Sequence, residues 1–156
     1  MYTSDVDNAL IAKLGADPEL LALCPNGVYW DEAPPGCQRF VIVRLVEHVD
    51  EPMFGGTAYE DIVYDVQVHV LSTTNGDTLA AAARVDALLH GGDLTIAGYK
   101  LMILERRGYL RDTPRDAVDP SIRWFQRGGQ YHLMACPVGD TRKSERGSTD
   151  GRTHSR

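Results

Sequence analysis

Histidines, cysteines and clustered carboxylates are the side chains of this sequence that could do chemistry. No histidine is spaced from a second histidine, a cysteine or a carboxylate as metal ligands on one helix face are. The cysteines are odd in number and lack the CxxC or CxxH spacing of a metal site or a redox pair. The residues concerned are His48, His69, His90, His132, His154, Cys24, Cys37 and Cys136. We therefore predict no metal, no cofactor and no cysteine nucleophile.

One polar strand face is the remaining candidate for a site. Glu60, Asp61 and Asp65 are the acidic set, and Asp65 shares its face with Gln67 and His69. A strand does not gather hard-cation ligands as a loop does. Residues four apart in a strand are also about 13 Å apart, at roughly 3.3 Å per residue. A face that is solvated or that contacts another subunit is the favoured interpretation, and a small enzyme or ligand-binding module using this face is the alternative.

Catalytic sequence motifs are not found either. The chain has no GxSxG, GxxxxGK[ST] or GxGxxG pattern. Its double glycines, Gly55–Gly56 and Gly128–Gly129, do not stand between a strand and a helix N-terminus, where anions bind. We predict no catalytic residues and a protein that is not an enzyme.

The elements that would position these side chains follow from periodicity and capping. An apolar stripe at helical spacing predicts a helix from Asp5 to about Gly15, and Asp17 before Pro18 predicts a short helix to residue 23. An alanine-rich stretch, residues 79–89, predicts a third helix with a broad apolar face that includes Leu79 and Leu89.

Strands are predicted between these helices and after them. Residues 28–30 form a short strand, residues 39–49 and 58–71 two long ones, and residues 94–96 with 99–107 a hairpin covered on both faces. A last pair, residues 122–127 and 130–136, is interrupted at Gly128–Gly129. The order of elements predicts an α+β domain, with helices packed on one face of an antiparallel sheet.

Two long loops are expected to project from this domain. Residues 50–57 form a hairpin loop that carries Met53 and Phe54, and residues 108–121 form a charged, proline-punctuated loop. Met53 and Phe54 either contact another subunit or fold back onto their own core.

Composition limits the class of protein. With 156 residues, 43% hydrophobic and 24% charged, the chain suffices for one domain, assigned to residues 1–138. That part carries eleven Lys and Arg against nineteen Asp and Glu, which argues against sequence-specific nucleic-acid binding. No secretory signal or membrane-spanning run is found, so a soluble, cytoplasmic protein without a membrane partner is expected.

The C-terminal residues 139–156 differ from the domain. They contain no large apolar residue and carry five Lys and Arg against three Asp and Glu. We expect a disordered basic tail, which either keeps the protein soluble or orders on an acidic partner or nucleic acid.

The arrangement resembles tail-completion and tail-terminator proteins of long-tailed bacteriophages. The likeness rests on Val28-Tyr29-Trp30 before a proline-containing loop, on Phe40-Val41-Ile42-Val43, on the alternating strand from Ile62 to Val70, on the alanine-rich helix after it and on a closing strand near Tyr131 to Ala135. It covers about residues 5–136.

The resemblance implies a structural virion protein, assembled in the host cytoplasm into a hexameric ring that caps the tail tube and joins it to the head connector. Its expected partners are further copies of itself, the major tail tube protein and the connector or stopper protein. A head-tail connector of the neck is the neighbouring alternative. The expected contacts to subunits or adjoining rings are Met53, Phe54, Arg111, Arg115, Asp116 and Asp119.

Overall fold

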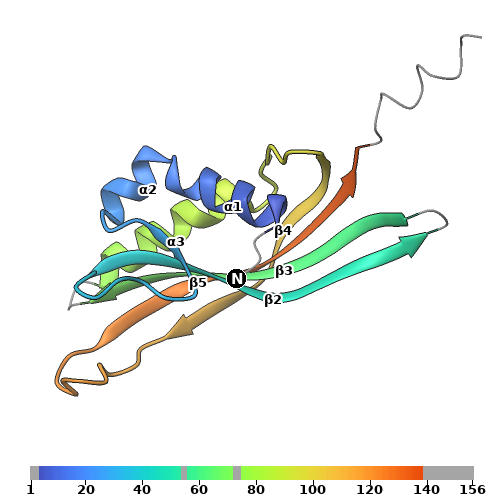
Figure 1. The fold of residues 1–156 in the computed structure, drawn as a ribbon. Helices are drawn as coiled ribbons and strands as arrows, with labels where there is room; N and C mark the ends of the chain where they lie inside the picture. The colour runs from blue at the N-terminus through green and yellow to red at the C-terminus, as the bar shows by residue number, and fades with distance from the viewer. Residues whose placement is uncertain (1–3, 54–55, 72–74, 139–156) are drawn as a thin grey trace, which may run out of the picture.

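The fold combines three helices with one open sheet (Figure 1). The computed structural model describes residues 4–53, 56–71 and 75–138. The helices are α1 (Asp5–Gly15), α2 (Pro18–Leu23) and α3 (Asn75–Leu89). The strands are β1 (Val28–Trp30), β2 (Arg39–Met53), β3 (Gly56–Leu71), β4 (Tyr99–Asp112) and β5 (Trp124–Pro137). None of the helices described is long and apolar enough to cross a membrane.

The sheet has five strands in the order β1-β2-β3-β5-β4. All neighbours are antiparallel except β1 and β2, which run parallel, so the predicted α+β class is confirmed but the sheet is mixed. The parallel start is fixed by Asn26, whose Oδ1 accepts the backbone N–H groups of Gln38 and Arg39, each at 3.0 Å. This side chain brings the beginning of β2 back beside the beginning of β1.

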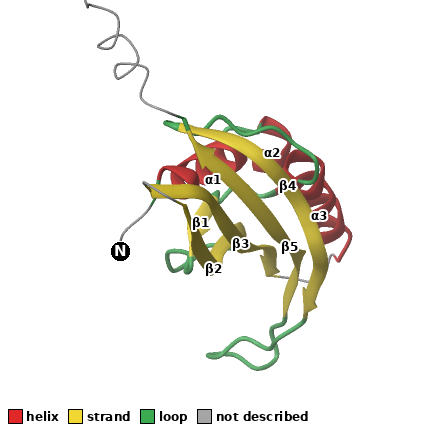
Figure 2. Ribbon diagram, turned by 90° about the vertical axis from the view of Figure 1, so that its right-hand side faces the viewer, coloured by secondary structure: helices red, strands yellow, loops and turns green. Residues whose placement is uncertain are grey.

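The helices cover one face of the sheet, as Figures 1 and 2 show. The alternation predicted for β3 is confirmed, because its core-facing side chains from Ile62 to Val70 are fully buried. They meet Val6, Leu10 and Leu14 of α1 in the core. The apolar face of α3 differs from the prediction, since Ala81, Val85 and Leu89 are buried while Leu79 is 49% exposed.

Two polar contacts tie the helices together and to the sheet. Asp17 caps α2 by accepting the Leu20 N–H at 2.9 Å, and its carboxylate also pairs with Arg84 of α3 at 2.7 Å. This guanidinium lowers the pKa of Asp17 to about 2. Ser4 and Asp7 form a capping box at the start of α1, and the buried Tyr64 hydroxyl donates to Asp7 Oδ1 at 2.5 Å.

Strands β2, β3 and β4 are longer than predicted, so both predicted loops are shorter than expected. β2 runs to Met53 and β3 begins at Gly56, so residues 50–57 are mostly paired strand and not a loop. The tip residues 54–55, with Phe54, lie outside the described residues. β4 likewise continues to Asp112, which shortens the charged loop to residues 113–123.

The predicted interruption at Gly128–Gly129 is wrong. Both glycines lie inside β5, which pairs continuously with β3. A Cβ at Gly128 would lie 1.8 Å from the carbonyl oxygen of Val66 on β3. The glycine thus permits a close approach of two strands that no larger residue allows.

Candidate assembly surface and polar clusters

Large apolar side chains are exposed on two strands at opposite sides of the sheet. On β2 they are Leu45, Val46 and Val49, which are 46%, 50% and 39% exposed. β1 pairs with β2 only as far as Val43. These three apolar residues therefore lie in the part of β2 that is an edge of the sheet. On the far side of the sheet β4 is the other edge strand.

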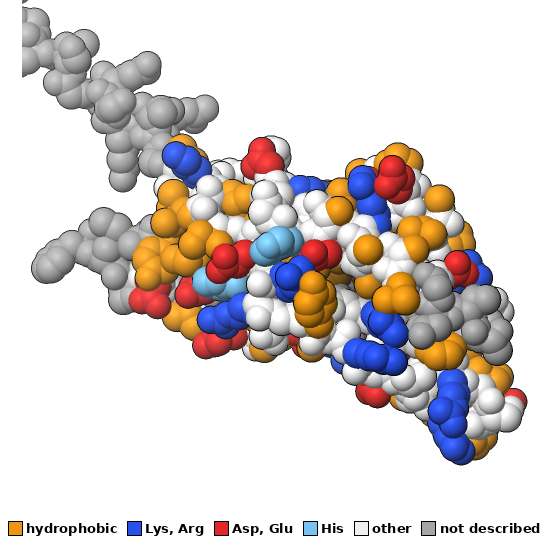
Figure 3. All heavy atoms as spheres, turned by 180° about the vertical axis from the view of Figure 1, so that it is seen from behind, with side chains coloured by type: hydrophobic (Ala, Val, Ile, Leu, Met, Phe, Trp, Pro, Cys, Tyr) orange, Lys and Arg blue, Asp and Glu red, His pale blue; other side chains and the backbone are white. Residues whose placement is uncertain are grey.

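The exposed apolar residues of β4 correct the prediction that this strand is covered on both faces. Met102 is 50%, Ile103 38% and Tyr109 76% exposed. The pairing of β4 with β5 shifts register between Leu101 and Ile103, which places Met102 at an irregularity. Figure 3, which views the molecule from behind, shows apolar side chains gathered in groups among charged ones.

A groove of about 370 Å³ lies beside the β4 edge, between α3 and strands β4 and β5. It is lined by apolar and charged side chains that include Leu79, Tyr109 and Arg111. Arg106 lies over the Tyr109 ring, with its guanidinium carbon 4.1 Å from the centroid, and pairs with Asp86 at 2.7 Å. Arg111 thus lines the same groove as Tyr109, which is 76% exposed.

Three of the other predicted contact residues, Arg115, Asp116 and Asp119, lie at the end of the β4–β5 hairpin. Asp116 accepts the N–H groups of Val118 and Asp119 and the Trp124 Nε1–H at 3.1 Å, so its carboxylate shapes the loop. These bonds lower the pKa of Asp116. Arg115 is exposed in a short bridge to Arg123. Met53 ends β2, at the other hairpin.

The polar face considered for a ligand does not form a convergent site. Gln130 Nε2 donates to Asp65 Oδ1 at 3.1 Å. The His69 ring stacks on Phe40 with the centroids 5.1 Å apart, and burial lowers its pKa to about 4, which keeps it neutral. On the same side of the sheet, His132 Nε2 contacts Asp61 Oδ1 at 2.5 Å. Asp61, Asp65 and His69 thus each have a separate local partner.

The cysteines give no sign of nucleophilic chemistry. Cys24 lies in the core, and burial raises the pKa of its thiol to about 11. Thiolate is the reactive form, so this thiol is poorly suited to attack. Cys37 and Cys136 are partly buried and form no disulfide bond.

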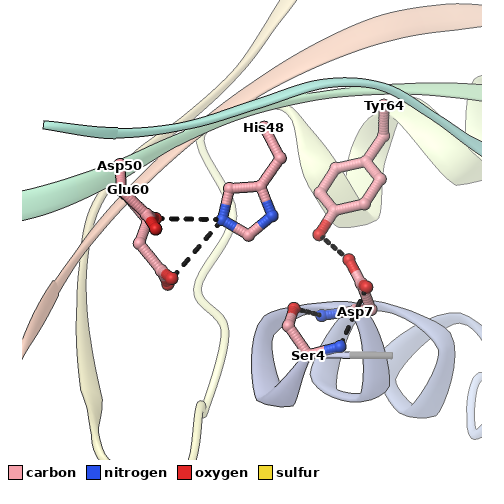
Figure 4. Close-up of polar contacts among 6 residues, drawn as sticks. All are labelled: Ser4, Asp7, His48, Asp50, Glu60 and Tyr64. Carbon is pink, nitrogen blue, oxygen red and sulfur yellow. Dashed lines mark hydrogen bonds and ion pairs between the residues drawn. The ribbon is translucent and has the colours of Figure 1, made fainter. Parts of the chain in front are cut away.

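One cluster was missed by the sequence reasoning. His48 and Asp50 on β2 and Glu60 on β3 point toward one another near the N-terminus of α1 (Figure 4). Asp50 is the register partner of Glu60. His48 lies two residues before Asp50, on the same face of β2. Pairing of positions 50 and 60 requires strands that extend to Met53 and Gly56 and a register shift between Glu51 and Pro52, and the predicted loop over residues 50–57 contained neither.

Comparisons with known proteins agree with this architecture. The family model described as "Tail completion protein gp17" matches residues 8–114. Among solved structures, a chain from a structure titled "Virion of native gene transfer agent (GTA) particle" is 25% identical, with a TM-score of 0.51. The alignment covers 81% of this chain and 92% of that chain. A search of curated proteins found no match. The chain therefore belongs to the tail completion protein gp17 family and is a structural protein of the phage virion tail.

Proposed function

We propose that six copies of this chain close into a ring that caps the tail tube and joins it to the head connector. The observation that supports this proposal most is that β2 and β4, at opposite sides of the sheet, both expose large apolar side chains. We call these two strands the apolar edges. Long edge strands with exposed apolar side chains are covered in most soluble proteins, because they invite pairing with other chains. Two different edges on one subunit suit a head-to-tail contact, and such contacts form a ring when the rotation between neighbouring subunits closes.

In the proposed contact, the β2 edge of one subunit meets the β4 edge of the next. Val46 and Met102 are each about half exposed and lie at irregularities in the pairing of β2 with β3 and of β4 with β5. Apolar anchors of this kind, surrounded by charge, carry most of the binding energy in protein interfaces. Neither residue belongs to the core, so both can be changed without unfolding the subunit.

The two hairpin ends are the proposed contacts to adjoining rings. The β2–β3 hairpin carries Met53 and Phe54, and the loop after β4 presents Arg115 and the 92% exposed Val118. The bonds made by Asp116 hold that loop in one shape before any partner arrives, which lowers the entropy lost on docking. We assign Arg111 and Asp119 to the same surface.

A mixing experiment tests the head-to-tail contact. Val46→Asp and Met102→Asp each place a charge on one edge, so either variant alone should remain monomeric. Mixed together, they should form heterodimers and no rings, because one intact β2 edge can still meet one intact β4 edge. Thr95→Asp, at an exposed site beside α1, is the matched control and should assemble like the wild type.

Native mass spectrometry of the four samples gives the result directly. Dimers of Val46→Asp alone or of Met102→Asp alone would contradict a head-to-tail contact, and full assembly of either variant would remove that edge from the interface. The neck connector is the alternative function. Binding to purified head connectors but not to tail tubes would favour it.

A further inference from the structure

The His48–Asp50–Glu60 cluster lies where the β2–β3 hairpin leaves the helical layer (Figure 4). One ligand atom from each of the three residues falls within 4.8 Å of the other two. His48 Nε2 is 3.5 Å from Asp50 Oδ1 and 3.4 Å from Glu60 Oε1. One imidazole nitrogen therefore faces two carboxylate oxygens from two strands.

The two distances from His48 Nε2 are longer than those of a charged hydrogen bond. A charged N–H donor and a carboxylate oxygen normally approach to about 2.7–2.9 Å. Ligand atoms at about 2.0–2.2 Å from a tetrahedral cation are, by contrast, about 3.3–3.6 Å apart. Both nitrogen–oxygen separations at His48 fall in the second range.

Burial supplies an independent reason to expect a ligand. Glu60 is only 9% exposed, and its Oε2 has no hydrogen-bond partner, nor does His48 Nε2. A buried carboxylate oxygen left without a hydrogen bond costs free energy unless something neutralises it. No lysine or arginine within the described residues forms an ion pair with Asp50 or Glu60. The cluster thus lacks a positive charge at the point where the ligand atoms of the three residues converge.

The surroundings are negative as well. The Tyr99 hydroxyl interacts with the Glu60 carboxylate, and Asp5 and Asp50 add further negative charge around it. A cation placed between these side chains would be attracted by carboxylates from α1, β2 and β3.

We propose that His48, Asp50 and Glu60 bind a divalent transition-metal cation such as Zn²⁺. One imidazole with two carboxylates suits Zn²⁺ and its neighbours, whereas Mg²⁺ and Ca²⁺ prefer oxygen ligands alone. Three protein ligands leave one tetrahedral position for water or for a donor from another molecule. The cation holds β2, β3 and the buried Glu60 together at the base of the hairpin. The site stands independently of the proposed ring, which rests on other residues.

The test uses the full chain without an affinity tag, freed of metal by a chelator. Titration calorimetry with Zn²⁺ should give one site per chain, and Co²⁺ in its place should give the intense visible spectrum of tetrahedral oxygen and nitrogen ligation. His48→Gln and Glu60→Gln should each weaken binding by more than the roughly 10–100-fold that loss of an outer partner costs. Circular dichroism checks that the variants remain folded.

His132→Gln is the matched control. His132 also lies between two carboxylates, but it faces Asp61 with Nε2 and Glu105 with Nδ1, so no single nitrogen shares a cation with both. This variant should keep wild-type affinity. The proposal is overturned by absence of stoichiometric binding, by unchanged affinity in His48→Gln, or by a thiolate band in the Co²⁺ spectrum, which would point to the cysteines.

Discussion

Removal of the Asp7 carboxylate tests how the helical layer is fastened to the sheet. In Asp7→Ala, α1 loses the acceptor for the Ser4 N–H, and the fully buried Tyr64 loses the acceptor for its hydroxyl. Loss of a capping contact costs about 0.5–2 kcal/mol. A buried donor left without a partner costs about 1–3 kcal/mol. We expect a total loss of about 2–4 kcal/mol in the free energy of unfolding, since the two terms overlap.

The loss is best measured by urea denaturation in the assembly-blocked Val46→Asp background, because assembly would otherwise add to the apparent stability. The midpoint of thermal unfolding should fall by about 4–16 °C, at roughly 2–4 °C per kcal/mol for a domain of this size. Asp5→Ala removes an exposed carboxylate from the same helical turn and should cost about 0.3–1 kcal/mol.

A double-mutant cycle with Tyr64→Phe isolates the bond between the two side chains. We expect a coupling energy of about 1–2 kcal/mol, within the range found for residues in contact. If Asp7→Ala costs no more than Asp5→Ala, or if the two changes add within about 0.5 kcal/mol, the bond does not anchor α1.

Three further predictions concern other parts of the molecule. Because the pKa of Asp17 is lowered to about 2 by Arg84, its contribution is complete above the unfolded value of 3.8 and lost as pH falls toward 2. After a discount for the partly exposed Arg84, Asp17→Asn should remove about 1 kcal/mol of acid-dependent stability, seen in urea unfolding at pH 2 and pH 6. Gly128→Ala should destabilise by about 1–3 kcal/mol or more, whereas Gly108→Ala, which meets open space, should cost less than about 1 kcal/mol, and equal costs would contradict the close approach of β3 and β5. A thiol reagent should label native Cys24 far more slowly than the other two cysteines, and equal rates would place Cys24 outside the core.

Local patterns in the sequence were enough to predict the helices and the buried strand. Leu10 and Leu14 recur at helical spacing, and Asp17 before Pro18 marks the start of α2. The alternation through β3 correctly identified its core face, although His69 and Val63 on the other face are buried too. Capping and periodicity act between near neighbours, so they can be read without knowledge of the fold.

Features that depend on distant pairing were not predicted. Nothing in β1 indicates a parallel partner, because that arrangement depends on Asn26 bonding to residues twelve and thirteen positions away. Gly128 was predicted to interrupt the last strand pair, although its role is to let the Val66 carbonyl approach. The site at His48 needed the register of a hairpin whose strands were predicted to end too early.

The central claim is that the apolar edges on β2 and β4 join copies of this chain in a ring at the end of the tail. The most direct measurement is electron microscopy of the purified protein, alone and mixed with tubes of the major tail protein. Closed rings, with one seated at the end of each tube, are the predicted result. A protein that remains monomeric in both samples would contradict the account.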